Sequence, residues 1–281
     1  FGKSPRHASR IDRRDGIAQG HDGQNYSLPS RDMICSMIEI QARSTPFDGL
    51  VCIASCDKAV PAHLMAIARL NLPSVFVPGG AMLAGPDGLT LEMIGTCLAR
   101  WRRGELDDRE FARLRREACP SCGACQFMGT ASTMQVMGEA LGLSLPGSAL
   151  IPVNREELAD SVRNAASALM GLLERGLRSR DILTREALEN AVMVHAAIAG
   201  STNAVMHLTA IAREAGVPFE PLLFDDLHRR VPWLADIKPS GRYPGEYFWL
   251  AGGVPEIMRQ LGDLLHLDVL TVPGKTVGEN L

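Results

Sequence analysis

The sequence predicts an α/β fold in which a parallel sheet is flanked by helices. Two short apolar runs, 49–54 and 74–77, have the length and composition of buried parallel strands. Between them, an apolar pattern of helical spacing follows Pro61, a residue that suits the first turn of a helix. Strand, helix and strand within about thirty residues is the order of a βαβ unit. We therefore expect the two strands to pair in parallel.

The rest of the chain is predicted to be helical around this unit. Before it, Ser30 is placed to cap a helix over 31–44, where apolar residues recur at helical spacing. After it, a helix-rich C-terminal part is expected, with helices near 90–103, 107–117, 128–141, 155–176, 185–198, 203–215 and 254–265. No repeat, low-complexity tract or linker divides the sequence, so residues 1–281 are expected to form a single α/β domain.

Composition argues against two classes of partner. With 46% hydrophobic residues, 22% charged residues and a net charge of −3, the chain has no electrostatic reason to bind nucleic acid. No apolar run reaches the roughly 18 residues that span a bilayer, and the first residues lack the apolar core of a signal peptide. We expect a cytoplasmic protein with neither nucleic acid nor a membrane as partner.

The seven cysteines suggest metal binding or catalysis rather than disulfides, because the cytoplasm is reducing. Cys35 and Cys97 lie in apolar helical patterns, and Cys52 lies within the first predicted strand. For these three, the simplest interpretation is a small buried hydrophobe. The remaining four cysteines stand in two short motifs.

The first motif, Cys56-Asp57-Lys58, directly follows the first predicted strand. Open parallel sheets bind ligands at the carboxyl ends of their strands, where the loops converge. A cysteine thiolate suits a soft iron ion, and an aspartate suits a hard cation such as Mg²⁺. A cysteine beside a surface ion pair would give the same pattern, so this motif alone does not decide between them.

The second motif holds Cys119, Cys122 and Cys125 at C-x₂-C-x₂-C spacing. A bacterial ferredoxin opens with this spacing, but no fourth cysteine follows here. Structural zinc is an alternative, although no histidine pair stands at zinc-finger spacing. The hydroxylated residues that come next either bind a carboxylate at a helix N-terminus or only cap and pack that helix. These residues are Thr130, Ser132 and Thr133.

Two further polar segments give weaker signals. Asp15 opens the sequence DGIAQGHDG, in which carboxylates and glycines alternate as they do in loops around a cation and in many surface loops. Residues 199–203 (AGSTN) stand between two apolar helices and either cap the second helix or bind an anion. His195 and His207 lie in apolar helical patterns and are interpreted as core histidines.

Together these segments resemble the family of dihydroxy-acid dehydratase and phosphogluconate dehydratase. The matching sequences occur in family order: DGIAQGHDG, ASCDK, PGG, CPSCGACQFMGTASTM, EALGLSLPGS, ENAVMVHAAIAGSTNAVMHLTAIAREAG and AGGVPEIM. Within the family, the stretches CQFMGTAST and RSRDILTREALENAVMVHAA and the C-terminal residues look most similar to bacterial sugar-acid dehydratases of the xylonate type.

The resemblance implies a [2Fe–2S] or [4Fe–4S] cluster on three cysteines, with one iron open to substrate. Cys56 and Cys125 match two of those ligands. The third should lie upstream of the DGIA motif, where this chain has no cysteine. Cys119 and Cys122 match no universal ligand position and are expected to be structural.

The resemblance also implies Mg²⁺ and a missing half. Asp57, Lys58 and Asp15 match Mg²⁺ ligands, the lysine after carbamylation in some members. Family members continue into a β-barrel-like domain, absent here, that carries the catalytic serine. We therefore expect a cluster-binding fragment of a longer two-domain enzyme, with its catalytic residue beyond Leu281 and no activity alone. The full-length enzyme is expected to be a homodimer or homotetramer.

The reaction that the resemblance implies is the removal of water from a 2,3-dihydroxy carboxylic acid. The expected substrate is a sugar acid such as an aldonate, which would give a 2-keto-3-deoxy acid. Iron acts as Lewis acid toward the departing hydroxyl, and Mg²⁺ stabilises the developing enolate. Dihydroxy-acid dehydratase of branched-chain amino-acid biosynthesis is the alternative within the family. A non-catalytic metal-binding module and an inactive truncated fragment are the alternatives of another class.

Overall fold

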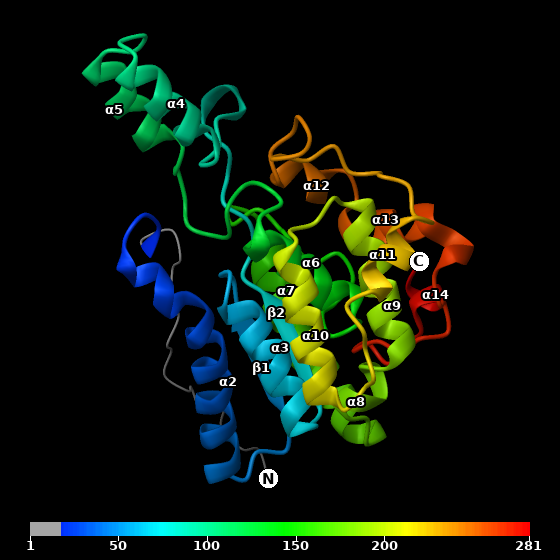
Figure 1. The fold of residues 1–281 in the computed structure, drawn as a ribbon. Coiled ribbons are helices and arrows are strands. Elements are labelled where there is room, and N and C mark those ends of the chain that lie inside the picture. The colour runs from blue at the N-terminus through cyan, green and yellow to red at the C-terminus, as the bar shows by residue number, and fades with distance from the viewer. Residues whose placement is uncertain (1–17) are drawn as a thin grey trace.

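A two-stranded parallel sheet lies at the centre of the computed structural model, which describes residues 18–281 (Figure 1). Strand β1 (Leu50–Ala54) pairs with β2 (Ser74–Pro78), with Leu50 opposite Ser74 and Ala54 opposite Pro78. Helix α3 (Ala59–Leu70) connects the two strands. The predicted βαβ unit and its parallel pairing are therefore confirmed.

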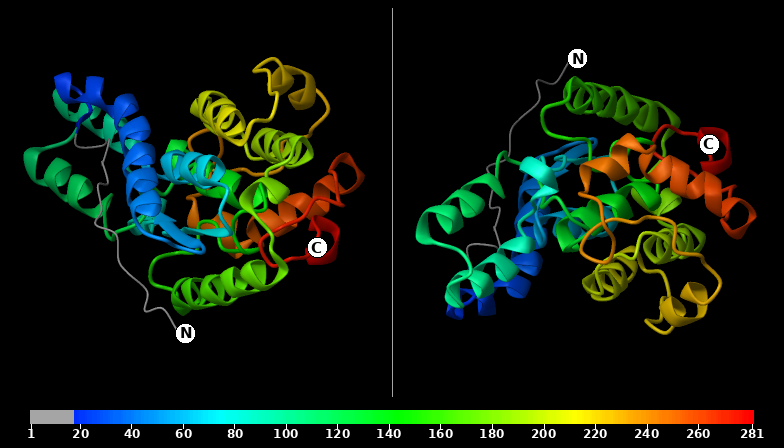
Figure 2. Two further views of the ribbon diagram at one scale, coloured as in Figure 1. Left: turned by 90° about the horizontal axis from the view of Figure 1, so that it is seen from below. Right: turned by 90° about the horizontal axis from the view of Figure 1, so that it is seen from above.

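Helices pack on both sides of this sheet. The strands lie between α3 and the long helix α7 (Glu156–Arg175), which contacts both of them (Figure 2). Helix α3 is itself covered by α2 (Ser27–Ser44) and α10 (Asn203–Ala215). This enclosure explains why residues 59–62 and 64–68 of α3 are all buried.

The two strands differ in burial. All five residues of β2 are buried, as the apolar run predicted. In β1, however, Val51 is 38% exposed and Ile53 is 44% exposed, so the prediction of a fully buried strand was wrong on one face. The reason is that α7 lies mainly against β2 and covers less of β1.

Most predicted helices are present with small shifts in their ends. Their bounds are α4 Met93–Arg102, α5 Asp108–Glu117, α6 Thr130–Ala140, α9 Arg185–Ala197 and α13 Gly253–Leu261, in addition to α7 and α10. Short helices that the sequence did not predict complete the chain. They are α8 Ser179–Ile182, α11 Leu223–His228, α12 Glu246–Leu250, α14 Val277–Asn280 and the 3₁₀ turns Asp22–Tyr26, Pro86–Gly88 and Gly262–Leu264.

Two helix starts correct the predictions. Helix α2 begins at Ser27, so Ser30 is not its cap; the Ser30 hydroxyl instead donates to the Ser27 carbonyl at 2.6 Å. Helix α3 begins at Ala59, two residues before Pro61. A proline in a first turn removes an N–H that has no partner within the helix, so Pro29 and Pro61 are tolerated inside the first turns and both helices start earlier than predicted.

Helices α4 and α5 form a hairpin that projects from the body (Figure 1). Its two helices contact each other, and the rings of Trp101 and Phe111 stack with centroids 5.1 Å apart. Cys97 is buried in this hairpin, and Cys35 and Cys52 are buried in the main core, as the sequence predicted. Burial raises the pKa of Cys35 and of Cys52 to about 12, so both thiols stay protonated.

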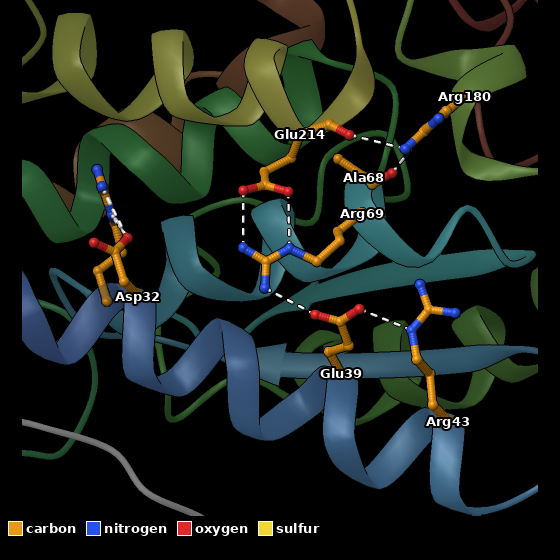
Figure 3. A network of polar contacts seen from close by, with 8 residues as sticks. Asp32, Glu39, Arg43, Ala68, Arg69, Arg180 and Glu214 are labelled. Carbon is orange, nitrogen blue, oxygen red and sulfur yellow. Dashed lines mark hydrogen bonds and ion pairs between the residues drawn. The ribbon is translucent and has the colours of Figure 1, made fainter.

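An arginine cluster joins three helices of the main body (Figure 3). Arg69 of α3 donates two hydrogen bonds to Glu214 of α10, each 2.8 Å, and one of 2.9 Å to Glu39 of α2. Arg69 holds the pKa of the Glu214 carboxyl below its usual range, and Arg43 together with Arg69 does the same for Glu39, so each carboxyl stays ionised. Arg180 adds hydrogen bonds to the backbone carbonyls of Ala68 and Glu214, at 3.0 Å each.

Among the helices of residues 18–281, none has both the length and the apolar character to cross a bilayer.

Candidate functional site

The Cys56-Asp57-Lys58 turn joins the carboxyl end of β1 to the first turn of α3, as expected. Cys56 and Asp57 are partly buried, and Lys58 is 6% exposed. Lys58 Nζ donates to Asp57 Oδ2 at 2.6 Å. The carbonyls of Cys56 and Lys58 accept from the amides of Val60 and Ala62, which joins the turn to the helix.

Glycines let the other loops approach this turn closely. The Gly79 amide donates to the Ala54 carbonyl at 3.0 Å, and a Cβ at Gly79 would come within 1.8 Å of Ser55 Oγ. Gly80 has φ +83° and accepts a 2.9 Å bond from the Ala124 amide. Any side chain at these glycines would separate the two loops, so the Pro-Gly-Gly sequence after β2 sets Cys125 beside the end of β1.

Helix α6 holds both loops through two side chains. The Gln135 amide donates to the Ser55 carbonyl at 3.2 Å and to the Gly80 carbonyl at 3.3 Å, and Ser132 Oγ donates to the Cys125 carbonyl at 2.8 Å. Gln135 is fully buried. Sequence reasoning missed it, because one glutamine in an apolar helix carries no pattern.

The pKa of the Cys125 thiol depends on the charged and ionisable groups that lie near it. Its pKa is raised to about 11, first by burial and then by the negative charge of Cys56 and of Asp57, with a smaller contribution from Cys119. Cys56, Asp57 and Cys125 therefore lie within electrostatic reach of one another. A thiol in such surroundings ionises readily only when a cation arrives to compensate the charge.

The structure brings together part of the residue set predicted from the sequence. Cys56 and Asp57 lie near Cys125, and Lys58 is paired with Asp57. Asp15 lies outside the described residues. The remaining two cysteines of the triplet, Cys119 and Cys122, are exposed.

The donor types suit the implied cofactors, but their number is incomplete. Thiols are soft donors that suit iron, and the Asp57 carboxylate is a hard donor that suits Mg²⁺. Within residues 18–281, no group of three or more His, Cys, Asp and Glu side chains is arranged to hold a metal ion. The described part of the chain thus offers two thiols and one carboxylate of a larger ligand set.

The AGSTN segment meets the start of α6 beside this site. Thr130 Oγ1 lies 3.1 Å from Ser201 Oγ and accepts a 2.8 Å bond from Nδ2 of the Asn203 side chain. The Ser201 backbone amide donates to Thr133 Oγ1 at 3.0 Å. The expected capping of α10 is only partly present. Thr202 is the N-cap and makes no side-chain bond, and Ser201 Oγ accepts a 3.4 Å bond from the backbone N–H of Asn203.

His195 and His207 are core histidines, as predicted. His195 is 3% exposed and His207 is fully buried. The ring of His207 lies 3.3 Å from a guanidinium nitrogen of Arg31. Sequence reasoning did not foresee the partner of His195, which is His228 at 3.1 Å.

Comparison with known proteins gives one consistent result. The family "Dihydroxy-acid/6-phosphogluconate dehydratase N-terminal" matches residues 1–280. Dihydroxy-acid dehydratase of Caldanaerobacter subterraneus subsp. tengcongensis is 45% identical, with 100% of this chain and 51% of that protein covered. Dihydroxy-acid dehydratases of Solidesulfovibrio magneticus and Aquifex aeolicus are each 43% identical, with 95% and 94% of this chain covered and 49% of each relative.

These matches confirm the resemblance inferred from the motifs. The chain spans about half the length of the curated relatives it matches. The order of the motifs, their convergence around α6 and the match over 1–280 agree with one another. The chain belongs to the dihydroxy-acid/6-phosphogluconate dehydratase family, to its N-terminal domain.

Proposed function

We propose that this chain is the cofactor-holding half of a dihydroxy-acid dehydratase. Such a hydro-lyase removes the C2 proton and the C3 hydroxyl of a 2,3-dihydroxy carboxylic acid as water, and the enol that remains becomes a 2-keto acid. The observation that carries the proposal is the convergence of Cys56, Asp57 and Cys125 at the carboxyl end of β1. Parallel sheets bind their ligands at this end.

Cys56 and Cys125 would hold a [2Fe–2S] or [4Fe–4S] cluster, and Asp57 would hold Mg²⁺ together with Asp15 and a carbamylated Lys58. When bound, the cluster would supply a Lewis acid for the leaving hydroxyl, and Mg²⁺ would supply positive charge for the substrate oxygens. Lys58 is 6% exposed, which agrees with a lysine set apart from bulk water. Carbamylation requires the neutral amine, so the ion pair that Lys58 makes with Asp57 at 2.6 Å must open before Lys58 is modified.

The start of α6 would orient the substrate. Its N-cap is Gly129, a residue without a side chain, so the N-cap itself supplies no side-chain acceptor to the first-turn N–H groups, and helix N-termini favour anions. Three polar groups lie within hydrogen-bonding distance of one another there: Thr130 Oγ1, Ser201 Oγ and the side-chain amide of Asn203. We infer that these groups receive the carboxylate and hydroxyl oxygens of the acid. The proton-abstracting residue is assigned to the half of the relatives that this chain does not cover.

The choice of substrate follows the relatives. The sequence motifs favoured a sugar acid, but the relatives compared above are dihydroxy-acid dehydratases. We therefore adopt the branched-chain dihydroxy-acid alternative, and the relatives give the sugar-acid prediction no support.

Anaerobic reconstitution tests the proposal. The chain is loaded with iron, sulfide and Mg²⁺ in the presence of dithiothreitol, which can supply a remaining thiolate, and bound iron and sulfide are measured. We expect iron and sulfide in equal amounts in the unmodified chain, and loss of most of both in Cys56→Ser and Cys125→Ser. The matched control is Cys97→Ser, which alters a buried thiol in the distant α4–α5 hairpin and should retain the cluster.

Two results would contradict the proposal. One is equal iron and sulfide in Cys125→Ser and in the unmodified chain. The other is stoichiometric zinc without sulfide, which would favour the non-catalytic metal-binding module.

A further inference from the structure

Two histidines form a hydrogen-bonded chain that ends on the AGSTN segment. In α9, His195 has its Nδ1 3.1 Å from Nε2 of His228 in α11 and its Nε2 2.9 Å from the Ser201 carbonyl oxygen. The two imidazole rings stack with centroids 5.1 Å apart and an interplanar angle of 24°. Phe224 packs edge-on against both rings and limits their rotation.

The hydrogen-bond partners of the two histidines determine which ring nitrogens carry protons. A carbonyl oxygen only accepts, so Nε2 of His195 must carry a hydrogen that it donates to Ser201. Burial lowers the pKa of His195 to about 4, so the ring is neutral at physiological pH and its Nδ1 has a lone pair. Nε2 of His228 must then be the donor to that lone pair. Each histidine is therefore assigned the tautomer with hydrogen on Nε2.

Hydrogen bonds hold both the carbonyl and the amide of Ser201. The Ser201 carbonyl is held by His195, and the Ser201 amide donates to Thr133 Oγ1 in α6 at 3.0 Å. Gly200 fits between these two anchors: a Cβ there would lie 2.5 Å from His195 Cδ2 and 3.0 Å from Thr133 Cγ2. With its backbone held on both sides, Ser201 presents its hydroxyl to Thr130, 3.1 Å away.

We propose that His195, oriented by His228, is a positioning residue that holds the Ser201 hydroxyl at the start of α6. The part of this inference that concerns the ligand, the oxygens of a hydroxy acid, rests on the proposed function. The hydrogen-bond chain itself does not. His195 does not touch the ligand; it determines where Ser201 meets it.

Nuclear magnetic resonance of the 281-residue chain tests this order of bonds. Long-range ¹H–¹⁵N correlation reports the tautomer of each histidine, and hydrogen exchange reports the Ser201 amide. Both histidines should be protonated on Nε2 at neutral pH. In His228→Leu, His195 loses its donor, so its Nδ1 and Nε2 shifts should move toward a tautomer mixture and the Ser201 amide should exchange about fivefold faster. In His228→Gln, whose side-chain amide can still donate, both signals should return toward the original values.

His266→Gln is the matched control, because His266 pairs with Glu189 elsewhere on α9 and does not contact Ser201. A His195 protonated on Nδ1 in the unmodified chain would overturn the proposal, whatever the variants do. So would a His228→Leu chain with unchanged His195 and Ser201 signals. None of these signals depends on metal loading, so failure of the iron assay would count against the proposed function alone.

Discussion

Two polar clusters of the protein shift the pKa of their acidic groups in opposite directions. In the arginine cluster (Arg69, Glu39 and Glu214), the guanidinium of Arg69 faces two carboxylates and lowers the pKa of Glu214, and the pKa of Glu39 is lowered by Arg43 and by Arg69. In the thiol site (Cys56, Asp57 and Cys125), burial and negative neighbours raise the pKa of Cys125 to about 11. In the first cluster both carboxylates are ionised and share Arg69, and Arg43 adds a second guanidinium beside Glu39. In the second, Asp57 is paired with Lys58, and the raised pKa keeps the Cys125 thiol protonated.

The difference separates a structural network from a binding site. A cluster that neutralises its own charges stabilises the fold and has no charge left to bind a ligand. A cluster of acidic groups is costly unless a cation joins it, and the cation then lowers the pKa of its ligands. The thiol site holds a protonated thiol at Cys125, which is the donor type that the proposed cluster requires and which a bound metal ion would ionise.

The largest expected effect is the loss of Arg69. Arg69→Met leaves Glu39 and Glu214, whose side chains are 26% and 21% exposed, without their shared partner. We expect the free energy of unfolding to fall by about 2–3 kcal/mol, measured by urea denaturation. The pKa of Glu214 should rise more than that of Glu39, because Glu39 keeps its bond to Arg43, and carboxyl NMR titration can follow both. An unchanged unfolding curve would mean that the cluster is not the joint between α2, α3 and α10.

Glu139 of α6 shows what happens to a buried carboxyl without a cation. It accepts backbone hydrogen bonds from Gly147 at 2.6 Å and Ala149 at 2.7 Å, yet burial raises its pKa to about 7. Because the folded pKa lies above the ordinary 4.5, the folded chain binds more protons between pH 4.5 and 7. The contribution of Glu139 is complete below pH 4.5 and is lost as the pH rises toward 7.

Comparison with Glu139→Gln isolates this effect. The stability of the unmodified chain minus that of the variant should fall by up to about 3 kcal/mol between pH 4.5 and 7. His195, whose lowered pKa of about 4 acts in the opposite direction, titrates in both proteins and cancels in the difference. A difference that stays constant with pH would mean that the backbone N–H groups keep Glu139 ionised and that burial does not raise its pKa.

A smaller effect is expected at the thiol site itself. Asp57→Asn removes a negative neighbour of Cys125 and leaves the Lys58 ammonium nearby, so the pKa of Cys125 should fall below about 11. Alkylation of Cys125 by iodoacetamide at pH 8.5 in the metal-free chain should then be about threefold to tenfold faster, measured by peptide mass spectrometry. Asp226→Asn, at an exposed position of α11, is the control and should leave the rate unchanged.

The βαβ unit could be predicted because each strand and the helix between them carries its own apolar pattern. The strand-end rule placed only the Cys56 motif, and the meeting of Cys56 with Cys125 was expected from the family resemblance, since nothing local joins residues so far apart in sequence. Gln135 and the pairing of His195 with His228 were missed because single polar residues in apolar helices give no spacing to interpret. Helices as short as α11 were missed because about two turns are needed before a period is recognisable.

The smallest expected change in the free energy of unfolding is at the exposed ion pair between Arg43 and Glu39, next to the arginine cluster. Arg43 also donates to Glu39, at 2.8 Å, but its side chain is 62% exposed and it stands one turn along the same helix. Water screens this pair and the side chain loses entropy on pairing, so Arg43→Met should lower the free energy of unfolding by less than about 0.5 kcal/mol. Urea denaturation beside Arg69→Met gives the comparison directly. Equal losses in the two variants would mean that the number of ion pairs matters and their burial does not, which would remove the basis for treating the arginine cluster as structural.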